Sequence, residues 1–158
     1  MKTIVLGLGN PLLSDDGVGW RVAKEVARRT RDPQIEVDYC SLGGLGLMER
    51  LIGYERAILV DAVCTRREPI GTVSRVRLED IGNPGAGHTS SAHDASLQTA
   101  LEIGRQAGAH LPRDVVVIAV EADQVYEFSE SLTPAVETAV PTAVQAVLDE
   151  LAGWAAER

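Results

Sequence analysis

The sequence predicts a single α/β domain in three layers, with a twisted, mostly parallel five-stranded sheet and helices on both faces. Five strand-like segments alternate with segments of helical periodicity along the 158 residues. Two of these segments, 57–60 and 115–120, are apolar at every position, which is typical of parallel strands buried on both faces. The length and the 45% hydrophobic content fit one globular domain over residues 1–158.

Charge and composition argue against several kinds of partner. The net charge of -8 disfavours nucleic acid and anionic membrane surfaces. No run of about 18 apolar residues occurs, so no membrane span is predicted. The N-terminus lacks the apolar region of a signal peptide, and two cysteines, Cys40 and Cys64, are too few for a disulfide framework. We therefore expect a cytoplasmic protein.

The first strand, 3–6, ends in a glycine-containing turn. Gly7 and Gly9 interrupt the strand, Asn10 follows, and apolar residues at four-residue spacing predict the next helix over 16–29. Such a turn brings the chain to the carboxyl edge of the sheet, where open α/β sheets bind ligands. The phosphate-binding pattern G-x-G-x-x-G lacks its third glycine here, which disfavours a nucleotide site.

Two carboxylates, Asp15 and Asp16, stand at the start of that helix. They would repel a pyrophosphate, and they suit a cation better. Taken alone, they are explained as well by the helix dipole, which favours each of them by about 0.3–1 kcal/mol.

The strand 35–40 alternates apolar and polar residues and is expected near an edge of the sheet, with Cys40 as a small buried residue. A second glycine-rich turn follows, with Gly43 and Gly44 before a short helix over 45–52. This turn either lets the backbone approach a ligand or only reverses the chain.

The strand 56–60 is expected in the centre of the sheet and to end at Asp61. The Asp61 carboxylate would then lie at the same edge as Asn10. For an isolated aspartate, capping a loop is the commoner role.

An outer strand is predicted over 72–78, followed by a polar loop over 79–90. The sequence 91–94 fits an S-x-x-D capping box, so a helix is expected from there to about residue 108. His93 stands in its first turn, where the dipole favours a neutral imidazole able to bind a metal. A histidine bonded to nearby backbone is the simpler alternative.

The last strand is predicted over 114–121, and the last helix begins at Thr133 with N-cap chemistry. The loop between them, 122–132, carries Tyr126 and Phe128 and is a possible docking surface for a peptide. We expect Phe128 itself to anchor the loop rather than to bind a partner.

Asp16, Asp61 and His93 are far apart in sequence but are all predicted at one edge of the sheet. Two carboxylates and one imidazole, with open coordination positions, suit a borderline divalent metal such as nickel or zinc. Their convergence favours a metal-binding interpretation that none of the three supports alone.

The chain resembles the hydrogenase maturation endopeptidases, a family that trims the large subunit of nickel-iron hydrogenases. Four pieces carry the resemblance, in family order: Gly7-Leu-Gly-Asn-Pro-Leu-Leu-Ser-Asp-Asp-Gly-Val-Gly19, Val60-Asp61-Ala62, Ser91-Ala-His93-Asp94 and Leu132-Thr133-Pro134. The resemblance implies a phosphorylase/hydrolase-like fold and an aspartyl-type endopeptidase. The implied substrate is a nickel-loaded large-subunit precursor, which loses a C-terminal extension.

The resemblance also implies roles for individual residues. Asp16, Asp61 and His93 would recognise nickel supplied by the substrate and share in catalysis, with the general base unassigned. Asn10, Gly43 and Gly44 are candidate substrate-binding residues. Many family members carry aspartate before the double glycine, whereas this chain has Leu42, and some carry glutamate at the position of Asp16.

Three alternatives stay open. A non-catalytic nickel-recognising chaperone would use the same fold, and a Cys–His nucleophilic pair is a less favoured mechanism. The opening Gly-Leu-Gly-Asn-Pro also occurs in peptidyl-tRNA hydrolases, but that family expects an early histidine and a basic surface. The first histidine here is His88, and the net charge is -8.

Overall fold

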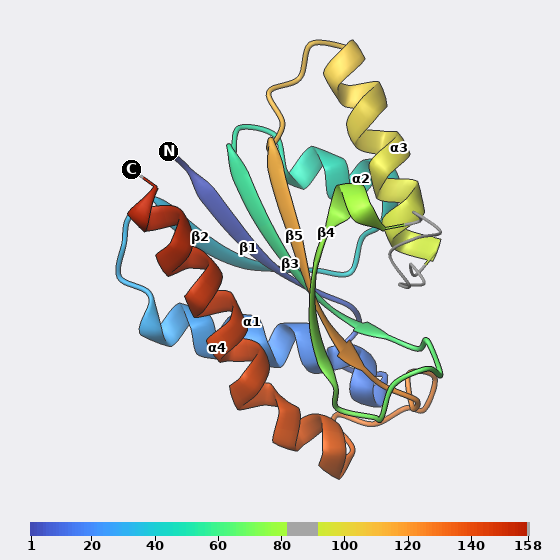
Figure 1. The fold of residues 1–158 in the computed structure, drawn as a ribbon. Helices are drawn as coiled ribbons and strands as arrows, with labels where there is room; N and C mark the ends of the chain where they lie inside the picture. The colour runs from blue at the N-terminus through green and yellow to red at the C-terminus, as the bar shows by residue number, and fades with distance from the viewer. Residues whose placement is uncertain (82–91, 158) are drawn as a thin grey trace.

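A computed structural model describes residues 1–81 and 92–157, with the side chains of 92–96 outside the description. The sheet has the strand order β2-β1-β3-β5-β4 (Figure 1). Its strands are β1 (Thr3–Leu8), β2 (Ile35–Cys40), β3 (Arg56–Val63), β4 (Val73–Arg77) and β5 (Asp114–Glu121). The helices are α1 (Val18–Arg29), α2 (Gly44–Arg50), α3 (Ala92–Gln106) and α4 (Pro134–Ala156), with short 3-10 helices η1 (Ser14–Gly17) and η2 (Leu78–Asp80).

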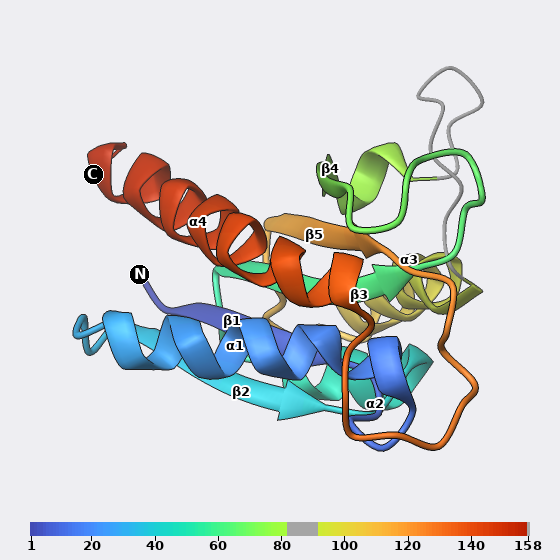
Figure 2. The ribbon, with the colours of Figure 1, turned by 90° about the horizontal axis from the view of Figure 1, so that it is seen from below.

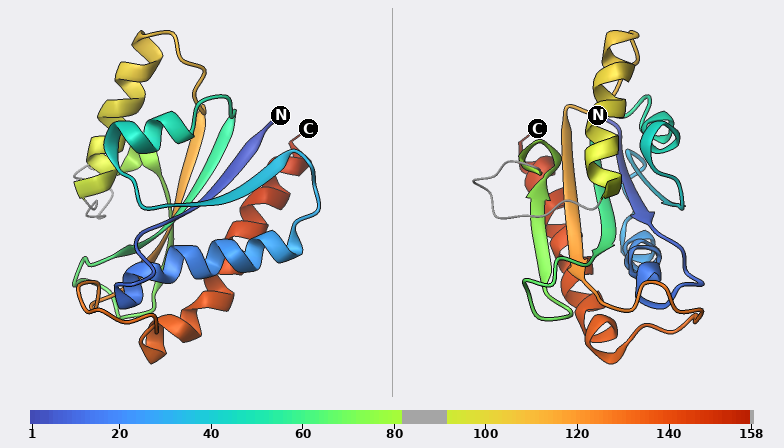
Figure 3. Two further views of the ribbon diagram at one scale, coloured as in Figure 1. Left: turned by 180° about the vertical axis from the view of Figure 1, so that it is seen from behind. Right: turned by 90° about the vertical axis from the view of Figure 1, so that its right-hand side faces the viewer.

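Four strands are parallel, and only β4 runs antiparallel, at the edge beside β5. Helices α1 and α4 cover one face of the sheet, and α2 and α3 cover the other (Figures 2 and 3). The predicted three-layer α/β domain with a mostly parallel five-stranded sheet is therefore confirmed. None of the helices described has both the length and the apolarity needed to span a bilayer.

Successive side chains of β3 point to alternate faces of the sheet. Ile58 and Val60 pack in the core beneath α1 and α4, whereas Leu59 packs in the core beneath α2 and α3. Because successive side chains of a strand point to opposite faces, Asp61 lies on the face of α2 and α3. This is also the face on which the helix that contains His93 packs.

Some predicted boundaries are wrong by a few residues. Strand β3 does not end at Asp61 but continues to Val63, because Asp61 and the next two residues still pair with β5. The first helix is divided: a 3-10 turn holds Asp15 and Asp16, and α1 begins only at Val18. Helix α2 starts at Gly44 and ends at Arg50, earlier than the expected 45–52.

Candidate functional site

The start of α1 is packed directly against the ends of two central strands. A Cβ atom on Gly19 would lie 2.3 Å from the carbonyl oxygen of Val60 in β3 and 2.5 Å from that of Leu8 in β1. Any side chain would therefore push the helix away from the sheet. The absence of a side chain brings the turn that carries Asp16 against the strand that carries Asp61.

Asp16 is held at the carboxyl edge of the sheet by the glycine turn. Its carboxylate oxygen Oδ2 accepts a hydrogen bond of 2.8 Å from the backbone N–H of Asn10. Gly9 has φ +108°, and a Cβ there would lie 2.0 Å from the carbonyl oxygen of Asp16. The turn can thus wrap closely around Asp16 only with glycine at this position.

Asp61 lies in the last part of β3, opposite Ala119 of β5, and is only 6% exposed. Its Oδ1 accepts a 2.9 Å hydrogen bond from the backbone N–H of Ala62. Buried carboxylates at the carboxyl edge of an open α/β sheet are candidates for a functional role.

Cys64, the residue just after β3, responds to the charge of Asp16. Burial raises the pKa of the Cys64 thiol, and the negative charges of Glu121, Asp123 and Asp16 raise it further. The charge of Asp16 therefore acts on the chain three residues beyond Asp61. A raised pKa disfavours the thiolate form of Cys64.

His93 is the second residue of α3, but its side chain lies outside the described residues. Among the side chains that are described, no three His, Cys, Asp or Glu residues form a metal-binding group. The set of Asp16, Asp61 and His93 therefore stays a prediction. The structure brings together the chain segments that carry the two aspartates.

Asp15 has a different role from its neighbour Asp16. It is fully buried, and its two carboxylate oxygens accept hydrogen bonds from the backbone N–H and the hydroxyl of Thr133, at 2.7 and 2.8 Å. Thr133 is the N-cap of α4, as expected, but its hydroxyl bonds Asp15 instead of capping the helix. Asp15 thus joins the site turn to the start of α4.

Replacing Asp15 by alanine is expected to destabilise the protein by about 2–3 kcal/mol, because two part-buried donors of Thr133 lose their partner. Asp16→Ala removes one half-buried hydrogen bond and is expected to cost about 1 kcal/mol. Urea unfolding followed by circular dichroism measures both values. Equal stability of the two variants would show that Asp15 does not join the turn to α4.

The turn after β2 is hydrogen-bonded to the glycine turn that holds Asp16. The Ser41 hydroxyl donates a 2.9 Å hydrogen bond to the carbonyl of Gly9, and the Gly9 N–H donates one of 3.1 Å to the carbonyl of Cys40. Gly43 and Gly44 therefore follow a segment bound to the glycine turn beside Asn10. Cys40 itself is buried, as expected.

Leu42 occupies the position before the double glycine and is 54% exposed. Asp38, the nearest preceding acid, forms a salt bridge with Arg50 of α2. Asp38 is thus engaged on β2 by Arg50. At residue 42 the chain presents an exposed apolar side chain.

The loop 122–132, here called the aromatic loop, is the main feature that the sequence did not place. Figure 2 shows it curling beside the turn before α1, where Ser14 N–H donates a 2.8 Å hydrogen bond to the carbonyl of Ser129. Phe128 is 90% exposed, so the expectation that it anchors the loop is wrong. Backbone hydrogen bonds to residues 12–15 hold the loop instead.

Glu121 at the end of β5 is a further buried acid near the site, with 2% exposure. Its carboxylate accepts hydrogen bonds from the backbone N–H of Thr65, at 2.9 Å, and from the Thr65 hydroxyl. Both oxygens are therefore occupied in holding the connection after β3. Like Asp61 it is a buried carboxylate in the last part of a central strand, but both of its oxygens bind Thr65.

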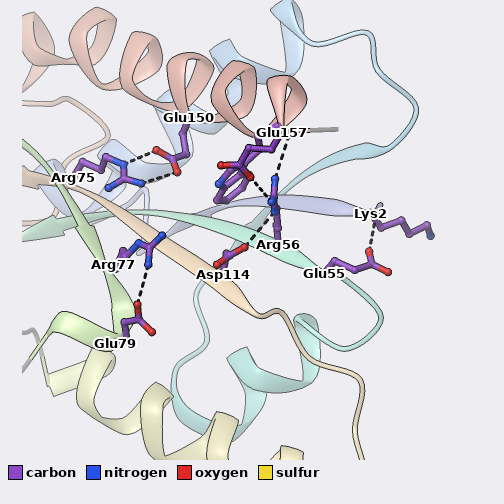
Figure 4. Close-up of polar contacts among 10 residues, drawn as sticks. Lys2, Glu55, Arg56, Arg75, Arg77, Glu79, Asp114, Glu150 and Glu157 are labelled. Atoms are coloured by element: carbon purple, nitrogen blue, oxygen red, sulfur yellow. Dashed lines mark hydrogen bonds and ion pairs between the residues drawn. The ribbon is translucent and has the colours of Figure 1, made fainter.

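The opposite edge of the sheet is stabilised by ion pairs. A cavity of about 590 Å³ there is lined in part by Arg75 and Glu150. Two guanidinium nitrogens of Arg75 donate hydrogen bonds to the two carboxylate oxygens of Glu150 (Figure 4). Nearby, Arg56 pairs with Asp114 at 3.3 Å (Figure 4). Because these charged side chains already form ion pairs with one another, this cavity is a weaker candidate for catalysis than the edge with Asp16 and Asp61.

The chain is similar to one family of known proteins. The family model of hydrogenase maturation proteases matches residues 20–150. The hydrogenase 2 maturation protease of Escherichia coli is 28% identical over 152 residues, which cover 96% of this chain and 91% of that protein.

Solved structures give the same result. The hydrogenase maturating endopeptidase HybD from E. coli superposes with a TM-score of 0.79 at 27% identity, over 97% of this chain and 93% of that one. The hydrogenase 2 maturation peptidase from a Thaumarchaeota archaeon gives a TM-score of 0.67 at 29% identity, over 96% and 98% of the two chains. The chain therefore belongs to the hydrogenase maturation proteases, the endopeptidases that process the C-terminus of a hydrogenase large subunit.

Proposed function

We propose that Asp16, Asp61 and His93 recognise the nickel of a nickel-loaded large-subunit precursor, from which the enzyme then removes the C-terminal extension. The observation that supports this most is the packing of Gly19 on β3, which brings the Asp16 turn against the end of the strand that carries Asp61. Nickel belongs to the substrate in this proposal. Two carboxylates and one imidazole leave coordination positions open for the precursor's own ligands.

The proposed reaction is hydrolysis by water. The water oxygen attacks the carbonyl carbon of the scissile peptide bond, the C–N bond breaks, and a proton passes to the leaving amine. One of the two site carboxylates takes the proton of the attacking water, in an aspartyl-type mechanism. Binding the nickel positions the peptide, so a precursor without metal would reach the site in the wrong geometry.

Asn10, Gly43 and Gly44 are the proposed substrate-binding residues. The side chain of Asn10 accepts a 2.9 Å hydrogen bond from Leu12 N–H, which fixes the turn beside Asp16. Gly44 has φ +54°, and the extended backbone of Gly43 before it leaves peptide groups uncovered by side chains. An extended substrate strand can pair with such backbone.

Two other proposals accompany this function. The two cysteines, Cys40 and Cys64, form no disulfide, which suits a reducing compartment, and we keep the cytoplasm as the proposed location. The family match also decides against the peptidyl-tRNA hydrolase interpretation of the opening motif.

The test is to incubate the protein with precursor that is loaded with nickel and with precursor that is free of it. We expect intact-mass spectrometry to show a shortened C-terminus only for the nickel-loaded form. Cleavage of both forms at equal rates would refute nickel recognition. Binding of the loaded form without any cleavage would instead support the chaperone alternative.

A further inference from the structure

The aromatic loop presents two large rings to solvent. Tyr126 is 88% exposed, and Phe128, which is the only phenylalanine of the sequence, is 90% exposed. Leaving such a side chain in water forgoes about 1.5–3 kcal/mol of the stabilisation that its burial would provide. Exposed apolar groups that gather in one place commonly mark an interaction site.

The loop that carries these rings is fixed to the site turn. Ser129 N–H donates a 3.0 Å hydrogen bond to the carbonyl of Leu12, and the Ser14 hydroxyl donates one of 3.0 Å to the carbonyl of Ser131. Leu12 is itself 52% exposed. A surface on a fixed backbone loses little conformational entropy when a partner binds, so it is well suited to docking.

A cavity of about 300 Å³ lies beside the same loop, and its lining residues include Leu132, Trp20 and Tyr39. The rings of Trp20 and Tyr39 stack with centroids 5.2 Å apart. The indole Nε1 of Trp20 is buried and has no hydrogen-bond partner among the described residues. An unsatisfied donor of this kind costs about 1–3 kcal/mol, which a carbonyl group of a bound segment would recover.

We propose that the aromatic loop and the Trp20 cavity together form an exosite that docks an apolar peptide segment of the large-subunit precursor. The inference rests on the proposed function, because it takes the precursor as the partner. The surface is continuous with the turn that carries Asp16, so a protein that brings its C-terminus to this turn passes over it. The exosite binds the substrate and takes no part in the chemistry.

A second copy of the chain is the competing occupant, since Phe128 of one copy could enter the Trp20 cavity of another. Two arguments favour the precursor. A dimer formed through this surface would cover the approach to Asp16, and each copy carries a net charge of -8, which opposes self-association.

The first test compares Phe128→Ala and Tyr126→Ala with Ile103→Ala, a control on α3 whose side chain is 51% exposed. We expect surface plasmon resonance to show a Kd for nickel-loaded precursor about tenfold or more above that of the wild type for each aromatic variant. The KM should rise in parallel, while kcat at saturating precursor stays unchanged. The Ile103 variant should bind like the wild type, and equal binding by all three would overturn the exosite.

A second test reads the cavity directly. The sequence has two tryptophans, so 5-fluorotryptophan labelling gives two fluorine resonances, which Trp154→Phe assigns. Adding unlabelled precursor is expected to change the chemical shift of Trp20 and leave that of Trp154 in place. If neither resonance shifts although the precursor is bound, the precursor docks at another surface and the exosite is refuted.

Two further outcomes separate this inference from the proposed function. Asp16→Asn should stop cleavage and weaken binding of nickel-loaded precursor. With nickel-free precursor its Kd should equal that of the wild type, while Phe128→Ala still raises the Kd about tenfold, so failure of the metal proposal leaves the exosite intact. If sedimentation shows a wild-type dimer that Phe128→Ala converts to a monomer, with precursor binding unchanged, the surface joins two copies and the exosite is refuted.

Discussion

Asp16→Asn and Asp61→Asn are each expected to lower the rate of precursor cleavage by at least about 100-fold while the fold is retained. Asparagine keeps the oxygen that accepts the hydrogen bond from Asn10 in one case and from Ala62 in the other. It removes the negative charge, which both metal contact and proton transfer require. The same loss is expected for His93→Ala, on which the metal proposal equally depends.

Asp38→Asn provides the matched control, because Asp38 is also an aspartate of the sheet, on β2, but forms a salt bridge with Arg50. A half-exposed pair of this kind contributes about 0–1 kcal/mol, so cleavage should remain near the wild-type rate. Mass spectrometry measures cleavage, and circular dichroism confirms folding. Normal processing by folded Asp61→Asn would remove Asp61 from the catalytic and metal-binding set.

The sheet could be predicted from the sequence because burial leaves a clear pattern. The two-sided apolar runs in β3 and β5 are central strands, and the alternating segment in β2 lies at an edge. The end of β3 was misjudged, since a polar residue is usually taken to end a strand. Asp61 instead continues the ladder with β5, and pairing between distant segments is not visible in the local sequence.

The expected position of Asp16 and Asp61 at one edge of the sheet has the same basis. The resemblance selected Asp16 rather than Asp15, but the local sequence gives no reason for that choice, because the two residues differ only in their tertiary contacts. Asp15 is structural because Thr133, far along the chain, donates both of its hydrogen bonds. The exposure of Phe128 could not be predicted either, because an apolar ring favours burial but the local sequence does not show whether other segments pack over it.

Gly19→Ala is expected to be among the most destabilising single substitutions in the chain, with a loss of at least about 3 kcal/mol. The new Cβ would lie 2.3 Å from the Val60 carbonyl oxygen and 2.5 Å from the Leu8 carbonyl oxygen. Both neighbours are backbone atoms of central strands, which cannot turn aside as a flexible side chain can. The helix must therefore retreat from the sheet, and the Asp16 turn must move with it.

Gly153→Ala is the matched control, because Gly153 also lies in a helix but, unlike the buried Gly19, is exposed and has nothing within 4 Å of the added Cβ. Alanine there should stabilise the protein by about 0.5–1 kcal/mol through its higher helix propensity, so the two substitutions are expected to have opposite signs. Thermal unfolding measures both, and failure of the Gly19 variant to fold is the extreme form of the expected result. A Gly19→Ala protein as stable as the wild type would show that α1 is not packed this closely on β3, and the main support for bringing Asp16 against the strand of Asp61 would be lost.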